Sequence, residues 1–265
     1  MRFIDEFPRA AAARLRGVFA DIDGTLTRGG KITADAYLAM WRLQAAGLAV
    51  VPVTGRPAGW CDMIARQWPV DGVIGENGAL AFYETNGELR RLYHPATTGD
   101  DLRCKLDAIR DDVLRDVPGS RVAKDQSYRL FDLAIDVCEE EPDLGLDAAE
   151  AIRAVFERHG AKAKISSIHV NGWFGDYDKL SMVRIFCSEV WDLDIEAARD
   201  EYIFCGDSPN DEAMFEFFPN ACAVANIAPF KDRMTHLPRY VAAREGGDGF
   251  AEIVDLILAL RQSNT

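Results

Sequence analysis

The sequence predicts an α/β protein in which a parallel-sheet core is interrupted by an inserted α+β cap domain. Short apolar runs alternate with helix-like segments near both ends of the chain, which is typical of a parallel sheet with crossover helices. Between these two end regions, the Asn86-Gly87 pair separates two strand-like runs, as in a two-residue hairpin. This pattern predicts antiparallel strands from this point of the chain. We therefore assign residues 1–82 and 173–265 to the core and residues 83–172 to the cap.

The first part of the core contains three expected strands and two expected helices. Thr33 is a suitable N-cap for the first helix, and Gly47 is a suitable stop. Pro57 suits the first turn of the second helix. The strands are expected at residues 17–22, 48–53 and 72–75, and the helices at about 33–46 and 57–69.

The rest of the chain is divided by the same criteria. Between residues 80 and 170, strands are expected at 80–83, 88–93, 121–124, 130–137 and 162–170, and helices at 100–117 and 145–159. In the second part of the core, helices are expected at 179–191 and 249–260, strands at 202–205 and 221–225, and a short helix between those strands.

Composition and charge limit the classes of function. The 265 residues include 30 Lys and Arg against 43 Asp and Glu, and the net charge of −13 repels nucleic-acid phosphates. The longest apolar stretches, 47–53 and 253–260, are far shorter than the ~20 residues that cross a bilayer. The six cysteines form no C-x-x-C pair, and residues 1–16 contain no long apolar region. We expect a cytoplasmic monomer or small homo-oligomer with reduced thiols and no nucleic-acid or membrane partner.

Two aspartates follow the first expected strand, in Asp21-Ile22-Asp23-Gly24-Thr25-Leu26-Thr27. Both carboxylates can face one site at the carboxyl end of the strand, where ligands of open α/β sheets bind. Gly24 permits a sharp turn that brings backbone N–H groups close to an anion. Neighbouring carboxylates repel each other, and a divalent cation would offset that cost. The alternatives are a turn whose side chains satisfy nearby backbone donors and a calcium loop.

A second acidic loop, Gly206-Asp207-Ser208-Pro209-Asn210-Asp211, follows the strand expected at 202–205 and occupies the same edge of the sheet. Helix capping explains part of it, with Ser208 as N-cap, Pro209 as the first helical residue and Asp211 as the capping-box acid. Capping does not require Asp207 at the end of the strand. Asp207 is therefore the better candidate for a metal ligand.

Two further strand-to-helix transitions have features that suit an anion. Val53-Thr54-Gly55-Arg56-Pro57 offers a hydroxyl, flexible backbone N–H groups and a helix N-terminus to phosphate oxygens, although alone it is only a capped turn. Lys179 begins an expected helix, where a cation is unfavourable unless an anion is near. Lys162 and Lys164 are alternatives to Lys179, but they fall in an expected cap strand.

In this chain order the four segments resemble the motifs of the haloacid dehalogenase superfamily of phosphotransferases. Residues 21–27 resemble its first motif, Thr54-Gly55-Arg56 its second, Lys179 its third and residues 206–211 its fourth. The resemblance implies a Rossmann-like core with a large α/β cap inserted between the second and third motifs. Sucrose-phosphatase-like and Cof-like members have two similar segments, Glu76-Asn77-Gly78-Ala79 and Gly246-Gly247-Asp248-Gly249-Phe250.

The resemblance also implies a role for each matching residue. Asp21 would attack phosphorus and form an aspartyl phosphate, and Asp23 would protonate the leaving oxygen and then activate water. Mg²⁺ would be held by Asp21, the backbone carbonyl of Asp23, Asp207 and Asp211. The transferring phosphoryl group would be held by Asp21, Gly24, Thr54, Gly55, Lys179 and Asn210. Substrate contacts are expected from Arg56, Asn77 and Asn171.

We therefore expect a magnesium-dependent phosphatase that hydrolyses a small phosphorylated metabolite, with a sugar phosphate as the first candidate. One alternative is a phosphomutase of the phosphomannomutase type, which would return the phosphoryl group to a sugar hydroxyl. Release of inorganic phosphate without a bisphosphate activator would reject it. The other is a non-catalytic phosphosugar-binding module, for which Asp23 would be dispensable.

Overall fold

Six parallel strands form the main sheet of the core, in the order β1-β15-β14-β13-β2-β5. The computed structural model describes residues 1–97 and 101–262. The strands are β1 (Arg2–Phe3), β2 (Gly17–Ala20), β5 (Ala49–Pro52), β13 (Tyr202–Gly206), β14 (Cys222–Ala223) and β15 (Tyr240–Val241). Because β2 lies between β5 and β13, the segments that follow these three strands meet at one edge of the sheet. The parallel core is thus confirmed, and it has two additional strands that were not expected, β1 at the edge and β15 beside it.

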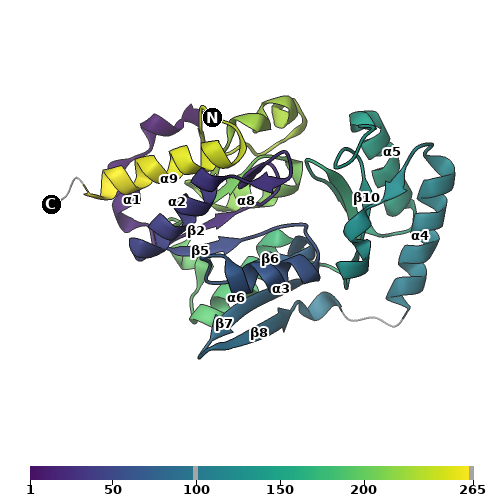
Figure 1. Ribbon diagram of the computed structural model, residues 1–265, viewed down its shortest axis with the longest axis horizontal. Coiled ribbons are helices and arrows are strands. Elements are labelled where there is room, and N and C mark those ends of the chain that lie inside the picture. Colours follow the sequence, from purple (N-terminus) through teal and green to yellow (C-terminus); the bar gives the residue numbers. More distant parts are fainter. Residues whose placement is uncertain (98–100, 263–265) are drawn as a thin grey trace.

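Helices cover both faces of this sheet (Figure 1). One face is covered by α1 (Arg9–Arg14), α2 (Ala34–Ala45), α3 (Ala58–Gln67) and α9 (Gly246–Gln262). The other face is covered by α6 (Lys179–Trp191), α7 (Ile195–Ala198) and α8 (Glu212–Phe217). Side chains of β2 alternate between the two layers, with Val18 and Ala20 on the first and Phe19 on the second. Thr33 caps α2 by accepting the N–H of Ala36, as expected.

A three-stranded antiparallel sheet extends the core beyond β5. It contains β6 (Val73–Gly75), β7 (Leu80–Thr85) and β8 (Glu88–Tyr93), and a parallel bridge from Val53 to Ile74 joins it to the main sheet. The expected hairpin at Asn86-Gly87 is confirmed. Its strands pack on the core, since the ring of Tyr83 meets that of Phe186 edge-on. The hairpin therefore lies with the core, although residues from 83 onward were assigned to the cap, because a turn signal does not say which layer its strands will join.

The cap is a four-stranded antiparallel sheet with two helices on one face. Its strands, in the order β11-β12-β10-β9, are β9 (Arg121–Val122), β10 (Asp132–Asp136), β11 (Lys162–Ile165) and β12 (His169–Trp173). The helices α4 (Leu102–Asp116) and α5 (Gly145–Arg158) pack on its apolar face. The single strand expected at 162–170 is wrong, because a turn in which the Ser166 N–H bonds to the His169 carbonyl divides it. Residue 100, the expected start of α4, lies outside the described residues.

A small cluster of side chains lies where the chain passes between core and cap. Trp173 stacks on Tyr177 with ring centroids 5.6 Å apart, and Ala79, Ala96 and Phe131 pack around them. We call these five residues the hinge cluster. It contains residues from the core, from both connections and from the cap, so it packs the two parts together at their junction.

Glu76 fixes the same junction by hydrogen bonds. One carboxylate oxygen accepts the N–H groups of Ala58 in α3 and Leu130 in the cap, at 2.9 and 2.8 Å, and the other accepts that of Phe131 at 2.6 Å. The side chain is fully buried, and its backbone has a φ of 45°. A core carboxylate thus holds the cap segment next to the hinge cluster.

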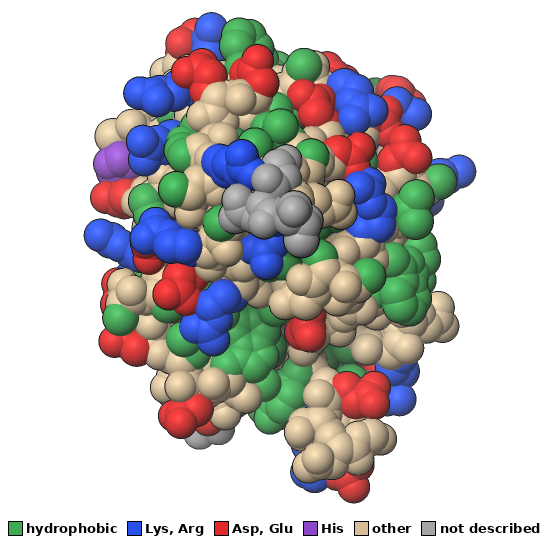
Figure 2. Space-filling view, turned by 90° about the vertical axis from the view of Figure 1, so that its left-hand side faces the viewer, with side chains coloured by type: hydrophobic (Ala, Val, Ile, Leu, Met, Phe, Trp, Pro, Cys, Tyr) green, Lys and Arg blue, Asp and Glu red, His purple; other side chains and the backbone are tan. Residues whose placement is uncertain are grey.

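The remaining elements are short and were not expected, because periodicity needs longer segments. They are β3 (Thr27–Arg28), β4 (Lys31–Ile32) and the 3-10 helices η1 (Ile4–Glu6), η2 (Glu76–Gly78), η3 (Pro95–Thr97), η4 (Lys124–Tyr128), η5 (Pro209–Asp211) and η6 (Ala225–Arg233). Within the described part of the chain, no helix is both long and apolar enough to span a membrane. On the face of the core turned away from the cap, acidic and basic side chains are interspersed (Figure 2).

Candidate active site

The two acidic loops meet at the carboxyl edge of β2 and β13. The N–H of Asp21 donates to the carbonyl of Cys205 at 2.8 Å, which aligns the ends of the two strands. Carboxylate oxygens of Asp21, Asp207 and Asp211 all lie within 4.8 Å of one another, and all three side chains are buried. The structure therefore gathers three of the four expected metal ligands at one point.

Lys179 enters this cluster from the N-terminus of α6. Its Nζ lies 2.6 Å from Asp21 Oδ1 and 2.7 Å from Asp211 Oδ1, and the side chain is buried. The capping box between Asp178 and Ser181 fixes the helix end that carries it. Lys162 lies on the cap surface in an ion pair with Asp176, so it is not placed for the role that Lys179 can fill.

Burial and mutual repulsion act strongly on these carboxylates. Burial raises the pKa of Asp21 to about 7, Lys179 opposes the rise, and Asp211 and Asp23 add to it. Burial also raises the pKa of Asp207, with Asp21 and Asp211 adding to the effect. For Lys179, burial lowers the pKa, but the pull of Asp21 and Asp211 outweighs it and the pKa is raised.

The donor set fits a divalent cation. When all three carboxylates are ionised, their charge of −3 and the +1 of Lys179 leave −3 + 1 = −2 in a buried place. Asp207 has no cationic partner among the described residues; its oxygens accept hydrogen bonds from Thr25 Oγ1 at 3.4 Å and Asn226 Nδ2 at 2.9 Å. Carboxylate oxygens are the ligands that Mg²⁺ prefers. Asp21, Asp207 and Asp211 are thus the residues that could hold it.

Gly24 and Asn226 close the first loop against the second. Gly24 has a φ of +80°, and a Cβ there would lie 2.3 Å from Asp207 Oδ2, so no side chain fits. The amide of Asn226 donates to the Gly24 carbonyl and to Asp207, both at 2.9 Å. Sequence reasoning missed Asn226, although it follows β14 at the same edge and its position was the available signal. The N–H of Gly24 donates to Thr27 Oγ1, so it is already used within the loop.

The Asp23 carboxylate lies outside the cluster of three and pairs with Arg56. The guanidinium donates from Nε to Asp23 Oδ2 at 2.8 Å and from Nη2 to Oδ1 at 2.7 Å, and it stacks on the ring of Trp60 at 4.2 Å. The backbone carbonyl of Asp23 accepts the Ser167 hydroxyl of the cap at 3.2 Å. Arg56, which is expected to contact substrate, lines the cavity beside Asp21 and holds both carboxylate oxygens of Asp23, the expected acid and base.

The second motif forms a buried loop under the cap. Thr54 Oγ1 accepts the N–H of Arg56 at 3.0 Å, and the Gly55 carbonyl accepts from Arg129 of the cap at 2.8 Å. Asn77 lies against Gly55, and its Nδ2 is buried without a hydrogen-bond partner. Asn171 approaches Gly55 from the cap, and its amide is held by Asp132 at 2.8 Å. The expected Thr54, Gly55, Asn77 and Asn171 are thus brought together here.

A small cavity separates the core from the cap at this point. Its volume is about 10 Å³, the space of a single water molecule. It is lined by Asp21, Asp23, Gly55, Arg56, Ser166, Ile168, His169, Asn171 and Asn210. The expected Asn210 therefore faces Asp21. This cavity is too small for any phosphorylated substrate, so a substrate would need more space between core and cap than this structure leaves.

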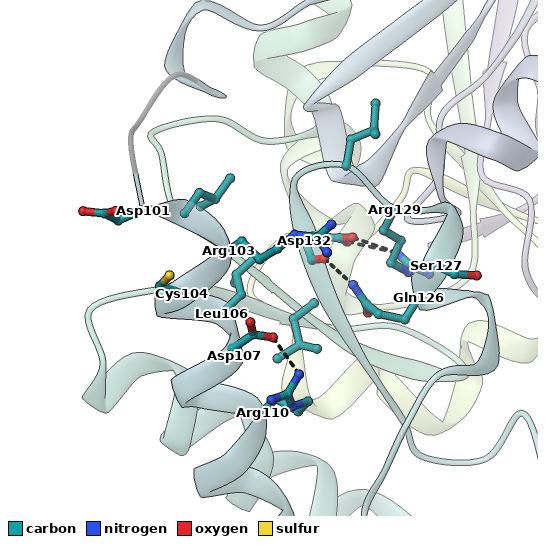
Figure 3. A pocket seen from close by; sticks show the side chains of 13 residues that line it. Asp101, Arg103, Cys104, Leu106, Asp107, Arg110, Gln126, Ser127, Arg129 and Asp132 are labelled. Carbon is teal, nitrogen blue, oxygen red and sulfur yellow. Dashed lines mark hydrogen bonds and ion pairs between the residues drawn. The ribbon is translucent and has the colours of Figure 1, made fainter.

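A much larger pocket lies elsewhere, on the cap. It measures about 710 Å³ and lies between α4 and the segment that joins η4 to β10 (Figure 3). Four of its charged side chains form two ion pairs, Asp107 with Arg110 and Arg129 with Asp132, while Gln126 donates to the carbonyl of Asp132. None of the four motifs lines it, so size alone does not make it the reactive site.

The comparisons with known proteins agree with this arrangement. Residues 18–98, which carry the first two motifs, match the family model of haloacid dehalogenase-like hydrolases. No curated protein matches the chain by sequence.

Several solved structures share the fold over almost the whole chain. A Thermoplasma acidophilum protein is 19% identical with a TM-score of 0.69, covering 92% of this chain and 98% of its own. A trehalose-6-phosphate phosphatase related protein is 18% identical with a TM-score of 0.60, covering 94% and 99%. A sugar phosphatase of haloacid dehalogenase subclass IIB is 15% identical with a TM-score of 0.64, covering 92% and 99%. These likenesses establish the common fold.

Proposed function

We propose that this chain, whose residues 18–98 match the family model of haloacid dehalogenase-like hydrolases, is a magnesium-dependent phosphatase of a small phosphorylated metabolite. The observation that carries the proposal is the convergence of Asp21, Lys179, Asp207 and Asp211 at one buried point, with Asp23 two residues beyond Asp21. Sugar phosphates are the first substrates to test, because similar structures are those of a sugar phosphatase and of trehalose-6-phosphate phosphatase relatives.

Asp21 is the proposed nucleophile. Its carboxylate is held at the end of β2 by the 2.6 Å contact with Lys179, which leaves its second oxygen to approach phosphorus. As the bond from Asp21 to phosphorus forms, the bond from phosphorus to the leaving oxygen breaks. Covalent catalysis of this kind divides a slow hydrolysis into two easier steps.

Asp23 is the proposed acid and base. It gives a proton to the leaving oxygen in the first step and takes one from the attacking water in the second. Since Arg56 holds both oxygens of Asp23 in this structure, the Arg56 contact must loosen at one oxygen when substrate is present. The water then attacks phosphorus, inorganic phosphate leaves, and the carboxylate of Asp21 is regenerated.

The negative charge on the phosphoryl oxygens would be neutralised by side chains of this protein and by the bound cation. Lys179, the Thr54 hydroxyl and the Asn210 amide are the proposed contacts of the phosphoryl group: Lys179 contacts Asp21, and Asn210 lines the cavity beside it. Asp21, Asp207 and Asp211, with the backbone carbonyl of Asp23, would hold Mg²⁺. The bound ion supplies charge neutralisation to the transferring phosphoryl group.

A panel of phosphorylated metabolites tests the proposal, with released inorganic phosphate as the readout. We expect turnover of at least one sugar phosphate with Mg²⁺ and none after chelation. Isomerisation that needs a bisphosphate activator would instead identify a phosphomutase. Saturable binding without release of phosphate would identify a non-catalytic module.

A further inference from the structure

A series of side-chain contacts connects the cap to Asp23, the proposed acid and base. His169 Nε2 lies 2.8 Å from Glu139 Oε2, and Glu139 Oε1 lies 2.6 Å from Arg56 Nη1. The opposite edge of the same guanidinium holds Asp23. The contacts therefore run from the cap sheet, across the boundary, to the first motif.

Arg56 is locked between core and cap. Its side chain is 2% exposed, and Trp60 covers one face of the guanidinium. Asp125 of the cap also approaches Nη1, at 3.3 Å. Hydrogen bonding from His169 lowers the pKa of Glu139 to about 2, with Arg56 adding to the effect against partial burial, so Glu139 is an anion at neutral pH. The orientation of Arg56, and with it Asp23, thus depends on two cap carboxylates.

The position of Glu139 in the cap ties this contact to closure. In the β10–β12 pair, Asp132 lies opposite Trp173 of the hinge cluster, whereas Asp136 lies opposite His169 at the far end. Four residue steps separate these ends, or about 13 Å along the strand. Since Glu139 follows β10 at that far end, a rotation about the hinge cluster moves Glu139 and His169 further than the hinge residues. A rotation of the cap about the hinge cluster would therefore break the contact between Glu139 and Arg56.

We propose that Glu139 and His169 are positioning residues, which act through Arg56 to orient Asp23 as the cap closes. The inference rests on the proposed phosphatase function. Glu139 fixes the Nη1 edge of Arg56, so the opposite edge presents Asp23 in one orientation toward the leaving oxygen. His169 fixes Glu139 in turn. His169 lines the cavity beside Asp21 and Glu139 does not; we assign both residues the same task, which is to set how well Asp23 delivers its proton.

A leaving-group comparison separates this role from a structural one. Phenyl phosphate and p-nitrophenyl phosphate differ in how much their leaving oxygen needs a proton, phenolate being the more basic. With Mg²⁺, Glu139→Gln should lower kcat/KM about tenfold for phenyl phosphate but less than about threefold for p-nitrophenyl phosphate, a part of the 10²–10⁴ of general acid catalysis. His169→Phe should show the same selectivity, and His169→Gln, which retains a donor, should restore most of the loss.

The neighbouring Glu140 gives a matched control. Its side chain is 42% exposed and pairs with Lys124, which is 81% exposed, so Glu140→Gln should behave as the wild type with both substrates. Equal losses with both substrates in Glu139→Gln and His169→Phe, or no loss, would overturn the inference. A wild type without activity on any phosphate ester would instead overturn the proposed function. If Glu139→Gln does not fold, the His169 pair of variants decides the question.

Discussion

Replacing Asp21 by Asn should abolish turnover and at the same time stabilise the metal-free protein at alkaline pH. Burial raises the pKa of Asp21 to about 7 in the folded protein, whereas the ordinary value is 3.8. The folded state therefore binds this proton more tightly than the unfolded chain does. Ionisation of Asp21 costs stability, and Asn carries no such cost.

The size of the effect follows from the two pKa values. At about 1.4 kcal/mol per pKa unit, the difference between 3.8 and about 7 corresponds to about 4 kcal/mol once Asp21 is fully ionised. Because the pKa of Asp21 is higher in the folded state, the stability lost on its ionisation is absent below pH 3.8. This loss grows as pH rises and is complete above pH 7. At pH 5 only about 1.6 kcal/mol has accrued. We expect Asp21→Asn to exceed wild type by about 2–4 kcal/mol at pH 8, and by clearly less at pH 5.

Urea unfolding in the presence of a chelator measures this difference at the two pH values. Asp255→Asn is a suitable control, since its side chain is 53% exposed and pairs with Arg42 on the surface. Added Mg²⁺ should stabilise wild type more than Asp21→Asn, because a ligand that binds only the folded state raises its stability. A variant less stable than wild type at pH 8, or an equal gap at both pH values, would refute the reasoning.

Three further substitutions test single parts of the structure by urea unfolding. Lys179→Met should cost about 3–5 kcal/mol without metal, because two buried carboxylates lose their shared cation, and a cost below 1 kcal/mol would contradict this. Gly24→Ala should cost more than about 2 kcal/mol, because the new Cβ meets a carboxylate oxygen at 2.3 Å; Gly47→Ala, where φ is +73° with nothing within 4 Å, should cost only about 1 kcal/mol. Glu76→Gln should cost about 2 kcal/mol, because an amide nitrogen then faces a buried N–H, and an unchanged midpoint would remove Glu76 as the anchor of the cap.

The parallel core could be predicted because its signals are local. Each strand is a short apolar run in the sequence. The candidate site residues Asp21, Thr54 and Asp207 stand where such a strand ends. Asp21 and Asp207 are far apart in sequence, yet parallel strands bring their carboxyl ends to one edge, so their proximity follows from topology alone. Lys179 could be singled out because a cation at a helix N-terminus requires a nearby anion.

Contacts between core and cap could not be predicted in the same way. The pairing of Asp23 with Arg56, and of Arg56 with Glu139, depends on how the cap packs against the core. No local sequence pattern carries that information. Asn226 stands in a short 3-10 helix without periodicity, so nothing marked it except its place after β14. The turn within the strand expected at 162–170 was hidden because serine fits both a strand and a turn.

The most direct test of the central claim is to find the residue that carries the phosphoryl group during turnover. Asp23→Asn should slow the second step more than the first for p-nitrophenyl phosphate, because the acidic leaving group needs little protonation while water still needs a base. Acid quenching and peptide mass spectrometry should then place a phosphoryl group on Asp21 in the presence of Mg²⁺. Turnover with the phosphoryl group on another residue, or unaltered turnover by Asp21→Asn, would contradict the account.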